Sequence, residues 1–75
     1  MQYRYVVADI NFSSMSVSRR QEIRQFSYGQ VDLPTAPRIG ESLMVNDVLR
    51  RLRIKDIEHE SGRPPMLVLD GTNLG

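Results

Sequence analysis

The sequence predicts a single all-β domain, a small barrel or sandwich built from five short strands. Three observations support this prediction. Apolar residues alternate with polar ones along several segments, turn residues recur at intervals of about ten residues, and no segment carries one clear helical stripe of apolar residues. A chain of 75 residues has room for one hydrophobic core only, so residues 1–75 are expected to form one domain.

The first strand is expected between Gln2 and Phe12, where apolar residues follow a period of two. The face predicted to be buried carries Val6, Ala8, Ile10 and Phe12. The face predicted to lie outside begins with Tyr3, Tyr5 and Val7, and it is therefore apolar as well. Because an exposed apolar strand face invites a contact, we expect another segment or a partner to cover it.

The second strand is expected between Ile23 and Leu33, after a serine-rich connector at residues 13–18. A short helix over residues 19–25 is the alternative at its beginning, because a serine and a glutamine three residues later have the spacing of a capping box. Ile23 is the one apolar residue in that segment, so a helix there has little to bury. We therefore favour a loop with at most one helical turn, followed by a strand in which Gly29 forms a β-bulge.

Prolines and glycines separate the last three strands. Two prolines within four residues exclude a helix or a paired strand, so residues 33–41 are expected to form a rigid extended connector. The remaining strands are expected at residues 42–45, 48–60 and 66–69, with turns at 46–47 and 61–65. The long strand needs a bulge near Lys55 and Asp56 to bring Ile57 into the core. Residues 70–75 have turn composition and are expected to fray.

The stretch from Leu33 to His59 resembles part of a known family. In it Pro34, Pro37, Arg38, Ile39, Gly40 and Glu41 enter a hairpin, and Arg53, Ile54, Lys55, Asp56, Ile57, Glu58 and His59 follow. This order is similar to a pattern in small SH3-like barrel proteins of bacteria and their phages. The resemblance covers about a third of the chain and implies a five-stranded SH3-like barrel, and an accessory protein that docks on a larger host complex. The aromatic groove of eukaryotic SH3 domains is not implied, because its acidic and aromatic runs and its tryptophan are missing.

Cysteine and histidine usage limits the chemistry of the chain. There is no cysteine and one histidine, His59, so disulfides, thiolate zinc sites, cysteine nucleophiles and paired imidazole ligands are excluded. His59 beside Glu58 and Glu60 has the residue types of a general base, but adjacent residues of a strand point to opposite faces. We therefore expect no enzymatic activity, no metal and no cofactor.

Charge and hydropathy favour a protein of the cytoplasm. Ten basic residues against nine acidic ones give a formal net charge of +1, whereas a dedicated nucleic-acid domain is usually far more basic. No stretch approaches the roughly 18 apolar residues of a membrane span, and the first residues do not resemble a secretory signal. We expect a cytoplasmic location and no membrane contact.

The remaining features predict binding. We expect a protein partner, with Arg50, Arg51 and Arg53 as polar anchors and Tyr3 and Tyr5 as an apolar patch. The alternative is a nucleic-acid-binding barrel that uses the same arginines, although the acidic residues that follow along the same strand oppose it. A second alternative is a self-assembling structural subunit such as a homodimer, because edge strands of an open barrel pair with other chains.

Overall fold

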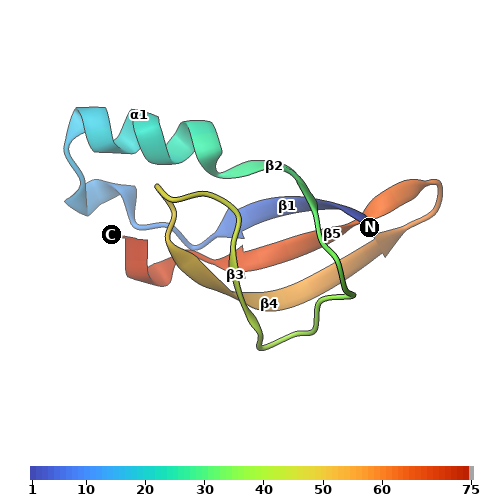
Figure 1. Cartoon of the computed structure of the whole chain (residues 1–75). Coiled ribbons are helices and arrows are strands. Elements are labelled where there is room, and N and C mark those ends of the chain that lie inside the picture. Colours follow the sequence, from blue (N-terminus) through green and yellow to red (C-terminus); the bar gives the residue numbers. More distant parts are fainter. Residues whose placement is uncertain (75) are drawn as a thin grey trace.

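The computed structural model describes residues 1–74, in which five strands and one α-helix surround a single core (Figure 1). The elements are β1 (Gln2–Ala8), α1 (Val17–Phe26), β2 (Tyr28–Asp32), β3 (Ser42–Met44), β4 (Arg51–Glu60) and β5 (Arg63–Asp70). The strands form one sheet in the order β2-β1-β5-β4-β3, and this sheet curls into a half-barrel. The prediction of a small five-stranded β architecture is confirmed at this level.

Strand β1 lies inside the sheet, between β2 and β5, although it comes first in the chain. It pairs antiparallel with β2, where Tyr5 lies opposite Gly29, and parallel with β5, where Tyr5 lies opposite Leu67. Strands β3, β4 and β5 follow one another as antiparallel neighbours. Helix α1 connects β1 to β2. Because β2 and β3 are not paired with each other, these two strands form the two edges of the half-barrel.

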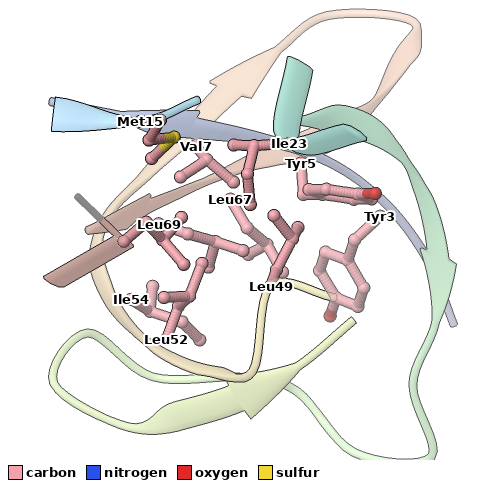
Figure 2. Close-up of a cluster of buried hydrophobic side chains, with 11 residues drawn as sticks. Tyr3, Tyr5, Val7, Met15, Ile23, Leu49, Leu52, Ile54, Leu67 and Leu69 are labelled. Atoms are coloured by element: carbon pink, nitrogen blue, oxygen red, sulfur yellow. The ribbon is translucent and has the colours of Figure 1, made fainter. Parts of the chain in front are cut away.

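The core lies on the concave side of the curled sheet (Figure 2). Five side chains are completely enclosed: Ile23, Leu49, Ile54, Leu67 and Leu69. They come from α1, from the turn before β4 and from the adjacent strands β4 and β5, and side chains of β1 extend the same cluster. Full burial of one such side chain contributes about 1.5–3 kcal/mol, and this cluster is therefore the main source of stability.

The prediction of the buried face is wrong within β1, whereas Ile10 and Phe12, which follow the strand, pack partly buried against the core as expected. Tyr3, Tyr5 and Val7 point into the core and are 8%, 7% and 7% exposed. Val6 and Ala8 lie on the opposite, convex side and are partly exposed. The apolar surface patch expected at the two tyrosines is therefore part of the core.

The environment of Tyr5 explains why the tyrosine face is the buried one. Its hydroxyl donates a hydrogen bond to the backbone carbonyl of Phe26 at 3.0 Å, so the polar end of the buried side chain is satisfied. Its ring lies against Gly29, where an added β-carbon would come within 3.1 Å of Tyr5 Cε2. The ladder is continuous at Gly29, so the bulge predicted there is wrong, and the glycine makes room for the aromatic ring instead.

The loop favoured for residues 19–25 is wrong, because helix α1 runs through this segment and extends beyond it. Ser16 caps the helix by accepting a hydrogen bond from the Arg19 backbone N–H at 3.2 Å. Ile23 is completely buried, although it is the one apolar residue of the segment. One apolar side chain within residues 19–25 is enough here, because Phe26 at the end of α1 also packs against the core. Strand β2 accordingly begins at Tyr28, later than expected.

The bulge predicted in the long fourth strand is confirmed. The register between β4 and β5 shifts between Ile54 and Asp56, and Ile57 packs partly buried against the core. Strand β4 begins at Arg51, not at residue 48, because the segment before it folds into turns. In that segment the backbone N–H of Leu49 donates to the carbonyl of Asn46 at 3.2 Å.

Strand β5 begins earlier than the predicted range of 66–69, at Arg63. Pro64 and Pro65 fit into it because the pairing with β4 is irregular there, and because the pairing with β1 begins only at Met66. The turn predicted at residues 61–65 is correspondingly shorter and lies at Ser61 and Gly62.

The end of the chain packs against the rest of the fold as far as Leu74, within the range 70–75 where the sequence predicts fraying. Residues Thr72–Leu74 form a 3₁₀-helical turn, and the Leu74 side chain is buried in the core. The backbone N–H of Gly71 donates to the carbonyl of Ala8 at 2.8 Å, which ties this segment to the end of β1. Gly75 lies outside the described residues.

Replacement of Gly71 by alanine is expected to destabilise the protein by about 2–3 kcal/mol, because the position is overpacked. A β-carbon there would lie 2.7 Å from each of three atoms, the Ala8 carbonyl oxygen, Ile10 Cγ1 and Val7 Cγ1. Urea denaturation measures the free energy of unfolding. Asn73→Ala, at an exposed neighbouring position, should change it by less than about 0.5 kcal/mol. An equal decrease in the free energy of unfolding of the two variants would contradict the close packing of Gly71 against its neighbours.

Replacement of Tyr5 by phenylalanine is expected to cost about 1 kcal/mol at neutral pH, because the bond to Phe26 is lost. Burial also raises the pKa of Tyr5 above its ordinary value of 10.0. The neutral phenol therefore contributes stability that is complete below pH 10.0 and is lost as the pH rises through the folded pKa. Denaturant titrations at neutral and alkaline pH measure how much the free energy of unfolding falls as the pH rises. This decrease should be smaller for Tyr5→Phe than for the wild type and for the exposed control Tyr28→Phe. If the free energy of unfolding of Tyr5→Phe fell as much as that of the wild type, another titrating group would be responsible for the alkaline destabilisation.

Candidate interaction surface

The convex face of the sheet carries a contiguous apolar patch, hereafter the convex patch, formed by Val6, Tyr28, Met66 and Val68. Val6 lies opposite Tyr28 of β2 on one side and opposite Val68 of β5 on the other. Met66 lies two residues before Val68 on the same face of β5. Tyr28 is 69% exposed, and the other three side chains are partly exposed. Apolar side chains from three neighbouring strands thus face solvent together.

Ion pairs surround the convex patch. Arg4, on the same face of β1, binds Glu60 at 3.1 Å and donates to the carbonyl of Pro64 at 2.9 Å, and its side chain is only 16% exposed. Lys55 binds Asp9 at 2.6 Å, and this hydrogen bond is the main reason why the pKa of Lys55 lies above its ordinary value. These two cations are paired within the chain, but exposed carboxylates also border the convex patch, because Asp56 and Glu58 of β4 lie opposite Val68 and Met66.

Two of the predicted anchors, Arg51 and Arg53, lie on the outer face of β4, as expected from the alternation. They are exposed and alternate with the buried Leu52 and Ile54. Neither forms an ion pair with any of residues 1–74 within 4.0 Å, in contrast to Arg4 and Lys55. Their guanidinium groups are therefore available for a carboxylate of a partner.

Strand β3 and the end of β5 form the surroundings of these two arginines. Met44, which is 49% exposed, lies opposite Arg51, and Ser42 lies opposite Arg53. Asp70 has a lowered pKa, chiefly because the Thr72 backbone N–H donates to its carboxylate and to a smaller extent because of nearby cations that include Arg53. The surface at this end of the sheet thus combines one exposed methionine, one carboxylate and two arginines that form no ion pair within residues 1–74.

Arg50 lies apart from the other two arginines. Its φ of 61° places it in the left-handed region directly before β4 begins, so it does not continue the alternation of the strand. It lines a cavity of about 420 Å³ together with Arg19 of α1 and Leu74. The three arginines predicted to act together are therefore divided between two surfaces.

The apolar half of the predicted site lies in the core, and other residues form the exposed patch. Tyr3 and Tyr5 are buried, so neither can offer a surface contact. The convex patch was missed because the wrong face of β1 was assigned to the core. One signal could have indicated it: residues 66–69 are continuously apolar, so β5 has apolar residues on both faces, and a single small core covers one face only.

Within residues 1–74 neither a cluster of metal ligands nor a membrane-spanning helix is present. Within residues 1–74 no three acidic or histidine side chains gather as metal ligands would, and His59 is exposed near the end of β4. In the same range no helix is both long and apolar enough to cross a membrane. Searches against protein-family models, curated proteins and solved structures find no match to this chain.

Proposed function

We propose that the protein is a small non-enzymatic protein-binding module whose contact surface is the convex patch, with Arg51 and Arg53 as polar anchors beside it. The observation that carries the proposal is that four neighbouring apolar side chains, one exposed and three partly exposed, lie together on one face of a very small domain. A chain of this length needs nearly all of its apolar residues for its core. Contiguous apolar residues left outside are therefore best explained by a contact.

The composition of this surface fits the general anatomy of protein interfaces. Tyrosine, methionine and arginine are enriched at such interfaces, and lysine is depleted. Tyr28 supplies a large exposed ring, Met66 an adaptable side chain, and Arg51 and Arg53 supply cations that carry no ion pair within residues 1–74. An apolar protein segment with a carboxylate near one end is the partner that these side chains would suit best.

Nucleic-acid binding through Arg50, Arg51 and Arg53 is the second candidate, and the geometry supports it less. Single-strand binding combines a basic groove with aromatic stacking surfaces. Tyr3 and Tyr5 are buried, which leaves Tyr28 as the one exposed tyrosine, and Arg50 lies apart from the other arginines. Binding of this kind would weaken steeply as the salt concentration rises.

We also propose the finer fold assignment and the biological setting that the resemblance over residues 33–59 implied. The assignment to the SH3-like barrels is supported by the antiparallel succession of β3, β4 and β5 and by the bulge that bends β4. A role as a bacterial or phage accessory protein that docks on a larger complex rests on that resemblance and on the small size of the domain.

The contact surface can be tested with a pair of matched variants. Tyr28→Ser removes the most exposed side chain of the convex patch, and Ile39→Ser removes a side chain of similar exposure, 63% against 69%, from the connector between β2 and β3. Tagged proteins are incubated with nuclease-treated lysate of the native host. We expect a stoichiometric protein to be retained by the wild type and by Ile39→Ser, and Tyr28→Ser to lose about 2 kcal/mol of binding free energy to it, or roughly thirtyfold in affinity. Equal retention by all three would contradict the patch, and recovery that disappears with nuclease would favour nucleic acid.

The polar anchors are tested separately. Arg51→Glu combined with Arg53→Glu reverses both charges on the outer face of β4 without touching the core. Binding to the same captured protein should weaken at least tenfold, because a carboxylate of the partner is then opposed by like charge. Arg38→Glu, at an exposed position of the connector, is the control for a single charge reversal away from the proposed surface. If the affinity of the double variant for the captured protein were unchanged, Arg51 and Arg53 would not be part of the contact surface.

A further inference from the structure

The hydrogen bonds between β1 and β2 determine which backbone groups of β2 face outward. Met1 and Leu33 form a bonded pair, in which each backbone nitrogen donates to the carbonyl of the other, at 2.9 and 2.8 Å. At the other end, the Val7 N–H donates to Ser27 at 2.8 Å. Bonded and non-bonded pairs alternate in an antiparallel ladder, so the odd-numbered residues of β2 bond to β1.

The even-numbered residues of β2 consequently point their N–H and C=O groups away from β1. These residues are Tyr28, Gln30 and Asp32. All three side chains are exposed, and none of their backbone groups bonds to another backbone group elsewhere in residues 1–74. The outer edge of β2 therefore presents a regular row of free donors and acceptors with the spacing that another strand requires.

The edge of β2 lacks the usual features that prevent pairing. It contains no lysine, no proline and no bulge. Its one charged side chain, Asp32, binds the N-terminal ammonium group of Met1 at 2.8 Å, so much of its charge is neutralised within the same chain. Nothing in this strand repels a second strand.

The row of free groups is also complementary to itself. An antiparallel copy centred on Gln30 would place Gln30 opposite Gln30 of the second copy, and Tyr28 opposite Asp32. The central amides can hydrogen-bond to each other, and no like charges face one another.

We propose that two copies of the chain associate through an antiparallel β2–β2 pairing centred on Gln30. Each of the three outward residues then exchanges two backbone hydrogen bonds with its counterpart. The two half-barrels join into one continuous sheet, and both convex patches remain uncovered on it. The inference goes beyond the proposed function, because the pairing needs no other protein. A dimer of this kind carries two convex patches and would bind a partner bivalently.

A backbone substitution at Gln30 tests the pairing directly. Gln30→Pro removes an N–H that the fold does not use, and the preceding Gly29 tolerates the restriction that proline imposes. Gln30→Ala keeps the N–H and is the matched control. Sedimentation equilibrium over a roughly hundredfold range of concentration should show reversible dimers for the wild type and Gln30→Ala, and a dissociation constant about a hundredfold higher for Gln30→Pro. Urea denaturation verifies that each variant is folded.

A second variant leaves the backbone unchanged. Gln30→Lys places two like charges opposite each other at the centre of the dimer, so it should dissociate the dimer at low salt and less so at high salt. Amide hydrogen exchange adds a residue-level readout, because the N–H groups of Tyr28, Gln30 and Asp32 should gain protection as the concentration of the wild-type protein rises. A wild-type protein that stays monomeric overturns the proposal. So does a dimer that persists in folded Gln30→Pro, since another surface then holds it.

Discussion

The parallel pairing of β1 with β5 is the constraint on which the rest of the structure depends. It places Tyr5 beside Leu67 and Val7 beside Leu69, so these side chains are buried together on the core-facing side of both strands. The same register puts Val6 beside Val68 on the other face. Because side chains alternate along a strand, one pairing decides both what is buried and what is left for contact with other molecules.

Much of the architecture could be predicted from the sequence, because local residue chemistry determines it. The prolines of residues 33–41 exclude a paired strand there, and the charged residues around Asp56 force a bulge if the neighbouring isoleucines are to be buried. The face of β1 could not be predicted in this way. Both faces are apolar, and the choice between them depends on Gly29 and the carbonyl of Phe26, which are distant in sequence.

Helix α1 shows a related limit of local reasoning. Within residues 19–25 Ile23 is the one apolar side chain, which argues against a helix when the segment is considered alone. In the folded chain that single side chain is completely buried at the end of the half-barrel. The same dependence on tertiary context separates Arg50 from Arg51 and Arg53, since its left-handed backbone ends the alternation on which the prediction relied.

The two proposed contacts use different properties of the same strand. The side chain of Tyr28 contributes to the convex patch, whereas its outward backbone groups belong to the edge of β2. Side-chain contacts depend on the identity of the residues, and strand pairing depends mainly on free backbone groups. A partner on the convex face and a second copy at the edge can therefore be bound together without competing for the same atoms.

The position of β5 beside β1 also determines the order of folding events. The two strands at the centre of the sheet lie at opposite ends of the sequence, so their contacts close a loop of nearly the whole chain. Such non-local pairing slows folding relative to helical proteins of similar size. During synthesis β1 cannot pair with β5 until β5 has left the ribosome, and until then both apolar faces of β1 are exposed. The interval before β5 emerges is therefore the stage at which this chain is most prone to associate wrongly with other chains.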